Sequence, residues 1–441
     1  MPAQNTPLAE TPAQTRRPNL LMILVDDLGR GDYSAFGTPD LRTPNIDRVF
    51  HEGVDFVNFF ANSPVCSPSR ASLMTGCYPD RVGVPGVIRQ WPEDSWGYLS
   101  PSAVLLPQRL APAGYHTALV GKWHLGLETP NLPGERGFEF FHGFLGDMMD
   151  DYYTHLRGGV NFLRRDCEVI EPQGHATDLF TDWACDYLHE RAGQEEPFFL
   201  YLAYNAPHDP IQPPEDWLAR VQQREPNIGP QRQRLIALIE HLDHGIGRVL
   251  GTLDELGLAQ DTLVVFNSDN GGVLRNGANN GPWRSEKGHV YEGGLRVPCA
   301  ARWPGHIPAG SRLLDPALTM DLYATLLSAA GVEPNPGIDG ASLLPAMLGE
   351  QSPTDRELYF VRREGGRPYC GLTIEAVRRG DWKLLHDSPY AALELYNLSA
   401  DPLEAQNLAQ TEPERFKELL VALMLHIQQG GEVPWQKPRQ D

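Results

Sequence analysis

Four apolar runs of this chain stop abruptly at polar or ionisable residues, and this pattern restricts the fold more than any other feature. Each run has the length and composition of a strand that is buried on both faces of a sheet. The runs are residues 19–25 before Asp26 and Asp27, residues 115–120 before Lys122 and His124, residues 198–204 before His208, and residues 262–266 before Asp269 and Asn270.

Helical patterns lie between these runs. One helix is expected to begin at Pro44 with Thr43 as its N-cap, and others cover residues 103–113, 176–192, 231–257 and 320–330. Strands that alternate with helices predict an α/β fold, with a mostly parallel central sheet between helices. Ligands of such sheets bind beyond the carboxyl ends of the strands. The polar residues named above are therefore expected to form one site.

The pattern changes after about residue 340. Short strand-like runs at residues 357–362, 373–378 and 382–385, followed by a helical pattern at 413–428, predict a small antiparallel sheet with a helix packed on it. We therefore expect a disordered leader at 1–17, a catalytic domain at 18–340 and an α+β C-terminal subdomain at 341–441. The 441 residues and 41% apolar content suffice for a large core.

Charge and cysteine usage exclude several classes of protein. The formal charge of −20 argues against nucleic-acid binding, which rests on a basic surface. The six cysteines show no zinc-ligand spacing, and the run at 20–25 is too short to span a membrane. The polar first 18 residues lack the apolar core of a signal peptide. This predicts a cytoplasmic protein, or a periplasmic or secreted one if a signal was removed.

The acidic residues at two strand ends indicate a metal site. Asp26, Asp27, Asp269 and the amide oxygen of Asn270 form a hard oxygen set, which suits Ca²⁺ or Mg²⁺ and not zinc. A regular strand would direct Asp26 and Asp27 to opposite sides, so a turn is needed to bring both onto one centre. The alternative is a solvated loop or a helix cap.

Cationic residues are available to meet an anionic substrate. Arg70, Lys122 and Lys287 are the candidates, with His124 and His208 as proton carriers. Together with three carboxylates and a divalent cation they leave the substrate-free site positive. This balance favours an anionic ester but does not choose sulfate over phosphate. Each residue taken alone is equally compatible with a surface lysine or a structural histidine.

The stretch from Pro64 to Gly76 places a cysteine near a predicted helix start. A helix N-terminus favours negative charge and lowers the pKa of a thiol, so Cys66 is a candidate nucleophile with Arg70 one turn further on. The alternative is a buried structural cysteine.

Five motifs resemble the type I sulfatase family. They are Cys66-Ser67-Pro68-Ser69-Arg70 continuing to Gly76, the segment 114–124 that ends in Gly121-Lys122-Trp123-His124, Ser268-Asp269-Asn270-Gly271-Gly272, Glu292-Gly293-Gly294-Leu295-Arg296-Val297-Pro298, and Asn279-Asn280-Gly281-Pro282-Trp283-Arg284 with Lys287. The last of these looks most like the arylsulfatase B (N-acetylgalactosamine-4-sulfatase) branch.

This resemblance implies an alkaline-phosphatase-like fold with a small C-terminal subdomain. It also implies that a formylglycine-generating or anaerobic sulfatase-maturating enzyme oxidises Cys66 to formylglycine (3-oxoalanine). Asp26, Asp27, Asp269, Asn270 and residue 66 would hold Ca²⁺, with Mg²⁺ as the alternative. One hydroxyl of the hydrated aldehyde would attack sulfur and expel an alcohol.

The same resemblance implies a role for each remaining site residue. His208 and Lys287 would assist the leaving oxygen, and His124 would deprotonate the second hydroxyl so that sulfate leaves. Arg70 and Lys122 would stabilise the aldehyde hydrate and the oxygens of the transferred group. The alternative activity is a phosphate or phosphonate monoester hydrolase of the same superfamily. Asn270, where such members tend to have histidine, favours the sulfatase.

Polar and aromatic loops predict a sulfated carbohydrate as the substrate. The candidate substrate-binding residues are Asp151, Tyr152, His155, Trp283 and Arg284. Ordinary loop surface is the alternative. The sequence does not indicate which sugar or sulfated position is recognised, whether action is exo or endo, or the oligomeric state.

Overall fold

The computed structural model describes residues 17–91, 94–350, 356–366 and 369–438, so most of the expected leader lies outside the described residues. At its centre, strand β1 (Asn19–Val25) pairs in parallel with β10 (Phe198–Ala203) and with β11 (Thr262–Ser268). All three strands are buried along their whole length. This burial explains why their sequences are continuous apolar runs.

The central sheet has ten strands in the described part of the chain, in the order β13-β2-β12-β11-β1-β10-β4-β5-β8-β9. The inner strands from β11 to β5 are parallel, which confirms the mostly parallel sheet, while β12, β8 and β9 join antiparallel neighbours. The remaining strands are β2 (Val54–Phe56), β4 (His116–Lys122), β5 (Phe140–Phe144), β8 (Leu163–Arg165), β9 (Glu168–Val169), β12 (Cys299–Arg302) and β13 (Ser311–Leu313).

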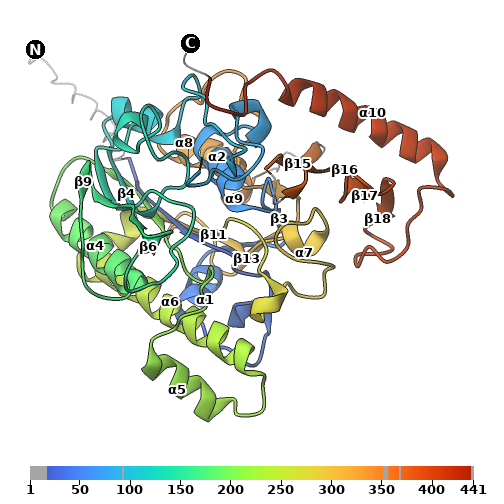
Figure 1. Ribbon diagram of the computed structural model, residues 1–441. Coiled ribbons are helices and arrows are strands. Elements are labelled where there is room, and N and C mark those ends of the chain that lie inside the picture. The colour runs from blue at the N-terminus through green and yellow to red at the C-terminus, as the bar shows by residue number, and fades with distance from the viewer. Residues whose placement is uncertain (1–16, 92–93, 351–355, 367–368, 439–441) are drawn as a thin grey trace, which may run out of the picture.

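Helices cover both faces of this sheet (Figure 1). On one face lie α1 (Pro44–His51), α4 (Ala176–Arg191) and α6 (Pro230–Glu255), with α5 (Glu215–Arg224) packed on α6. On the other lie α2 (Cys66–Thr75), α3 (Leu106–Leu110), α8 (Asp321–Ala329) and α9 (Leu344–Met347). A short helix α7 (Glu292–Leu295) follows the loop that carries Lys287.

The start of α1 differs from the expectation in one respect. The Thr43 side chain does not cap the helix, because its hydroxyl donates to Asp47 instead. The carboxylate of Asp243, on α6, accepts the N–H groups of Asn45 and Ile46. A tertiary contact therefore does the work expected of the local cap.

A second sheet forms the C-terminal part, as predicted, with α10 packed on it (Figure 1). Its four antiparallel strands and helix are β15 (Glu357–Glu364), β16 (Leu372–Arg379), β17 (Trp382–His386), β18 (Glu394–Asn397) and α10 (Pro413–Gly430). Strand β18 was not predicted. Phe360 of this sheet shares one apolar cluster with Phe60 and Leu318, which belong to a separate short ladder outside the central sheet.

Two small ladders complete the fold. Strand β3 (Phe59–Phe60) pairs with β14 (Ala317–Leu318), and β6 (Leu156–Arg157) pairs with β7 (Val160–Asn161). Among the described residues, no helix combines the length and the apolar character needed to cross a membrane. The expected boundary at residue 340 stays a prediction.

Candidate active site

Asp26 and Asp27 follow β1 at the carboxyl edge of the sheet. Asp27 has a φ of 68°, which is the left-handed conformation that Asp adopts more readily than most residues. This turn lets two adjacent carboxylates face one centre. One ligand atom each from Asp26, Asp27, Cys66 and His208 lie within 4.8 Å of one another.

The end of β11 supplies the opposite side of the site. Asn270 donates from Nδ2 to Asp27 Oδ1 at 2.7 Å, while its Oδ1 is buried without a hydrogen-bond partner. Asp269 Oδ1 accepts the N–H of Asp27 at 3.3 Å. An orphaned carbonyl oxygen beside two carboxylates is what a hard cation would satisfy. The donor set therefore fits Ca²⁺ or Mg²⁺.

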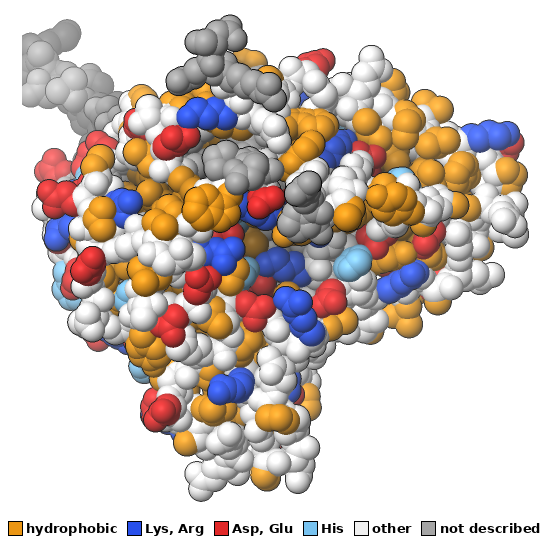
Figure 2. All heavy atoms as spheres, in the orientation of Figure 1, with side chains coloured by type: hydrophobic (Ala, Val, Ile, Leu, Met, Phe, Trp, Pro, Cys, Tyr) orange, Lys and Arg blue, Asp and Glu red, His pale blue; other side chains and the backbone are white. Residues whose placement is uncertain are grey.

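Three cations neutralise these carboxylates. Arg70 is fully buried and donates from Nη2 and Nε to Asp269 Oδ2 at 2.7 and 3.0 Å. Lys122 Nζ lies 2.5 Å from Asp26 Oδ2, and Lys287 Nζ lies 2.6 Å from Asp27 Oδ1. Figure 2 shows Lys, Arg, Asp and Glu side chains close together near the middle of the face it presents.

The electrostatics of the carboxylates follow from these partners. Burial alone would raise the pKa of Asp26, but the charge of Lys122 beside it lowers that pKa well below its usual range. Burial and the charge of Asp26 raise the pKa of Asp269. Asp26 is thus the firmly ionised member of the pair, which suits a metal ligand.

Cys66 is the first residue of α2 and is 3% exposed. Its Sγ donates to Asp26 Oδ1 at 3.3 Å. The expectation that the helix start lowers the thiol pKa is wrong. Burial, together with the charge of Asp26, raises that pKa well above its usual value. The residue stays a neutral thiol, so its own sulfur is a poor nucleophile here.

The two histidines are held in defined orientations. His124, with a φ of 57°, contacts the Ile88 carbonyl through Nε2 at 2.8 Å, and its buried Nδ1 has no hydrogen-bond partner. Nε2 must therefore carry the proton, which leaves Nδ1 as a free acceptor. Burial, followed by the charges of Lys122 and Arg70, lowers the pKa of His124, so a neutral base is favoured.

His208 uses the opposite nitrogen for support. Its Nδ1 donates to the Asp209 carbonyl at 2.8 Å, and Nε2 lies 3.7 Å from Asp27 Oδ2. Burial and the charge of Lys287 lower the pKa of His208. The structure thus brings all six predicted catalytic residues and the four oxygen ligands into one cluster. Sequence reasoning missed Ile88, because a supporting carbonyl has no signature.

The predicted substrate-binding residues are more dispersed. Tyr152 and His155 are buried and donate to main-chain carbonyls, and Asp151 accepts from Gln212 and from two nearby N–H groups. Arg284 donates to Tyr396 and to the Glu404 carbonyl of the C-terminal part.

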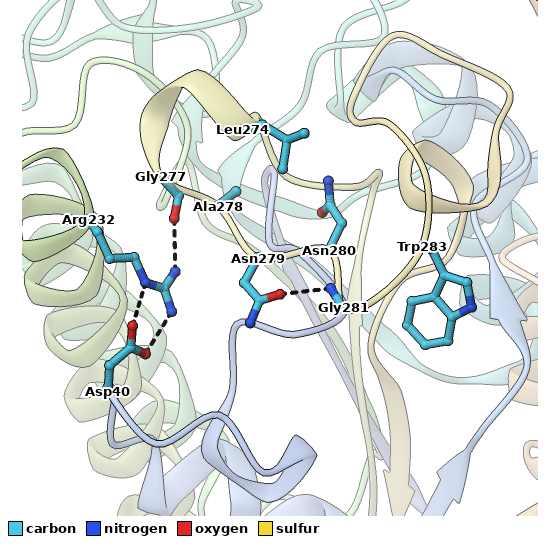
Figure 3. Close-up of a pocket in the computed structure, with 9 residues that line it drawn as sticks. All are labelled: Asp40, Arg232, Leu274, Gly277, Ala278, Asn279, Asn280, Gly281 and Trp283. Atoms are coloured by element: carbon cyan, nitrogen blue, oxygen red, sulfur yellow. Dashed lines mark hydrogen bonds and ion pairs between the residues drawn. The ribbon is translucent and has the colours of Figure 1, made fainter. Parts of the chain in front are cut away.

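Trp283 lines a pocket of about 350 Å³ beside the loop that follows Asn270 (Figure 3). Arg232, across the pocket, is paired with Asp40, and Asn279 accepts the N–H of Gly281. The hydrogen bonds of these polar side chains are therefore made to other residues of the pocket wall.

The fold and the site define a hydrolase of anionic esters with an alkaline-phosphatase-like sheet. Comparison with known proteins gives the family. The Sulfatase family model matches residues 18–332, and the model described as N-sulphoglucosamine sulphohydrolase, C-terminal, matches residues 283–430. The chain belongs to the type I sulfatase family and is a sulfuric ester hydrolase.

Relatives and solved structures agree. N-acetylgalactosamine-6-sulfatase of Sus scrofa is 36% identical over 389 residues, covering 83% of this chain and 71% of the relative. Arylsulfatase A of Bos taurus is 33% identical, covering 94% and 88%. The structure of Ps i-CgsB in complex with k-i-k-neocarrahexaose has a TM-score of 0.86 at 29% identity, covering 96% of this chain and 95% of that one. The narrower resemblance to arylsulfatase B stays a prediction.

Proposed function

We propose that Cys66 is the precursor of formylglycine and that the enzyme removes sulfate from a sulfated saccharide. The observation that carries this proposal is the position of Cys66. Its side chain lies 3.3 Å from Asp26 Oδ1, inside a cluster of three carboxylates and three cations, where burial and the charge of Asp26 raise the pKa of its thiol. A nucleophilic cysteine would need the opposite environment.

Asp26, Asp27, Asp269, Asn270 and residue 66 are the proposed ligands of Ca²⁺, with Mg²⁺ as the alternative. When both groups are present, the hydrated aldehyde would supply a hydroxyl for attack on sulfur, and the metal would lower the pKa of that hydroxyl. The family generally uses Ca²⁺ and formylglycine. The unpartnered Oδ1 of Asn270 supports a cation at this position.

The side chains of this chain have distinct proposed roles. Arg70 and Lys122, both fully buried, place two positive charges that would stabilise the oxygens of the transferred sulfate group. Lys287 donates toward the leaving oxygen, and His208 does so in the form that carries a second proton, on Nε2, in addition to the one on Nδ1. The free Nδ1 of His124 accepts the proton that must leave before sulfate is released.

Maturation would require a partner enzyme that acts before folding is complete. Every residue of α2, from Cys66 to Thr75, is buried. The folded chain therefore offers this motif to no other protein. A formylglycine-generating or anaerobic sulfatase-maturating enzyme would bind the segment while it is still extended.

A saccharide substrate is supported by the relatives. One is N-acetylgalactosamine-6-sulfatase of Sus scrofa, and the solved structure of Ps i-CgsB, 29% identical to this chain, is a complex with k-i-k-neocarrahexaose. Asp151, His155, Trp283 and Arg284 remain the residues proposed for substrate recognition, and Trp283 lines the pocket of Figure 3. Tyr152 is buried and bonded to main-chain carbonyls, so it is not retained in this set.

A phosphate or phosphonate monoester hydrolase is the second candidate. The observation in its favour is charge, because a divalent cation would leave the three neutralised ion pairs with a net positive site that accepts a dianion. A phosphonate monoester hydrolase shares the fold at a TM-score of 0.68 and 22% identity.

The test uses protein co-expressed with a maturing enzyme. Peptide mass spectrometry should find formylglycine at position 66, and ion chromatography should detect sulfate released from defined sulfated saccharides. Cys66→Ala should fold and release none. Turnover by Cys66→Ala would overturn the mechanism, and faster turnover of the matched phosphate esters would favour the second candidate. Activity confined to aryl sulfates would remove the saccharide.

A further inference from the structure

We infer that Tyr152 is a positioning residue for His208, and that it acts by fixing the main chain of the loop that presents this histidine to the leaving oxygen. We define the His208 loop as residues 205–212. The inference rests on the proposed function, because it takes His208 as a proton donor to that oxygen.

The hydroxyl of Tyr152 reaches both ends of the turn that bears His208. Its Oη lies 2.9 Å from the His208 carbonyl oxygen and 3.0 Å from the Asn205 carbonyl oxygen, so its single hydrogen is shared between these two acceptors. The N–H of His208 also donates to the Asn205 carbonyl, at 3.0 Å, which closes the turn. One phenol therefore ties the two carbonyls of this turn together across more than fifty residues of sequence.

The far end of the same loop is held by the neighbours of Tyr152. Gln212 accepts the N–H of Tyr152 at Oε1 and donates from Nε2 to Asp151 Oδ2, both at 2.8 Å. The Gln212 carbonyl lies 3.0 Å from His175 Nε2. Because His175 Nδ1 accepts the N–H of Thr177, Nε2 carries the proton and donates.

Tyr152 itself has little freedom to move. It is 1% exposed, and its ring stacks on His175 with centroids 4.9 Å apart and planes inclined by 22°. Burial, with the negative charges of Asp26 and Asp27 nearby, raises the pKa of Tyr152, so the hydroxyl remains a donor. Such a side chain cannot reach a substrate, but it can fix a loop.

The consequence for chemistry concerns the direction of His208 Nε2. The ring is oriented by its Nδ1 contact with the adjacent Asp209 carbonyl, so the ring moves with the main chain of the loop. Loss of the Tyr152 hydroxyl would free that main chain and misplace Nε2. A proton donor displaced by about 1 Å loses about 100-fold in rate. Substrate binding, which does not involve the buried phenol, would change little.

The experiment compares leaving groups on the matured enzyme. Tyr152→Phe keeps the ring and its stack on His175 but removes the hydroxyl. His208→Ala removes the acid. Tyr204→Phe is the matched control, since Tyr204 is fully buried and its Oη shares a hydrogen bond of 2.9 Å with Thr181 and not with the His208 loop. The substrates are 4-nitrophenyl sulfate, phenyl sulfate and a sulfated monosaccharide.

A weakly basic nitrophenolate leaves without help, whereas phenol and sugar alcohols need a proton. We expect Tyr152→Phe to stay within about threefold of wild type on 4-nitrophenyl sulfate, and to lose about 10- to 100-fold in kcat on the other two with KM nearly unchanged. Retained turnover of the nitrophenyl ester also shows that the variant is folded.

Other outcomes separate the two levels of the argument. If His208→Ala shows this dependence on leaving group and Tyr152→Phe does not, the inference about Tyr152 is wrong and the role of His208 stands. If Tyr152→Phe loses activity equally on all substrates, the residue is merely structural. If His208→Ala shows no such dependence, the acid role proposed for His208 fails first, and the inference fails with it.

Discussion

Lys122→Met would remove one of the two lysines that form ion pairs with the proposed metal ligands. Lys122 and Asp26 are both fully buried and form an ion pair, and Asp26 has Arg70 as its other cationic partner at 3.4 Å. Methionine has similar length and no charge. The three carboxylates would then face two cations instead of three, which leaves one buried negative charge without compensation.

The magnitude follows from this imbalance. Breaking a buried ion pair by removing one partner costs about 3 to 5 kcal/mol. Arg70 already forms an ion pair with Asp269 at 2.7 Å, so it compensates the charge of Asp26 only in part. We therefore expect Lys122→Met to lower the free energy of unfolding by about 3 kcal/mol when no metal is bound. Ca²⁺ should bind the variant more tightly than wild type. If the variant binds Ca²⁺ tenfold more tightly, the difference in free energy of unfolding between wild type and variant shrinks by about 1.4 kcal/mol at saturating Ca²⁺.

The assay is urea unfolding of wild type and variant, each in chelator and in excess Ca²⁺, with calcium affinities from calorimetry. Lys383→Met is the matched control. Lys383 is fully buried and pairs with Glu292 and Glu404 at 2.9 and 2.8 Å, away from the proposed ligands. The Lys383→Met variant should lose the same free energy of unfolding in chelator and in excess Ca²⁺. A stability gap for Lys122→Met that is the same with and without Ca²⁺ would refute Asp26 as a ligand.

Three further predictions concern the site and its support. Asn270→Leu should raise the Ca²⁺ concentration needed for half-maximal activity by about tenfold or more, because it deletes the unpartnered Oδ1; an unchanged calcium titration would contradict this. Gly271→Ala should abolish activity, since a Cβ there would collide with the Gly293 carbonyl and displace the loop after β11; a fully active variant, measured by sulfate release, would show that the loop can shift. Burial lowers the pKa of His175 from 6.5 to about 4, so the unfolded chain binds the proton first and stability falls as pH drops through that range. Asparagine at position 175 can still cap α4, so His175→Asn should fold. As pH falls from 7 to 5, its free energy of unfolding, measured by urea titration, should drop by about 2 kcal/mol less than that of wild type. Equal drops in the two proteins would contradict the lowered pKa of His175.

The sequence predicts the central strands and the polar residues after them because burial on both faces leaves a continuous apolar signature. Short edge strands carry no such signature. Strand β9 consists of two exposed residues, and the three residues of β13 pair with β2, which lies far away in the sequence. The turn at Asp27 was required by the argument, but its φ of 68° could be seen only in the structure.

Two site expectations could not be judged from local sequence for the same physical reason. A helix start at Cys66 argues for a lowered thiol pKa, but complete burial beside Asp26 outweighs the helix and raises it. Tyr152 lies in a polar, aromatic loop that suits sugar binding. Its hydroxyl instead meets carbonyls of the His208 loop, and nothing near Tyr152 in sequence reveals that contact.

The charge balance of the site bears on the order in which its parts assemble. In this structure Lys122 and Lys287 stand against the carboxylates that would bind a cation, so three negative side chains already face three positive ones. A neutral cluster can be buried without a metal, whereas three unpaired carboxylates could not. The protein could therefore fold around this site before the proposed Ca²⁺ binds, and a bound cation would then have to displace only the two lysine contacts. Each lysine that is displaced is free to turn its charge toward the substrate, which is where the sulfate oxygens need it.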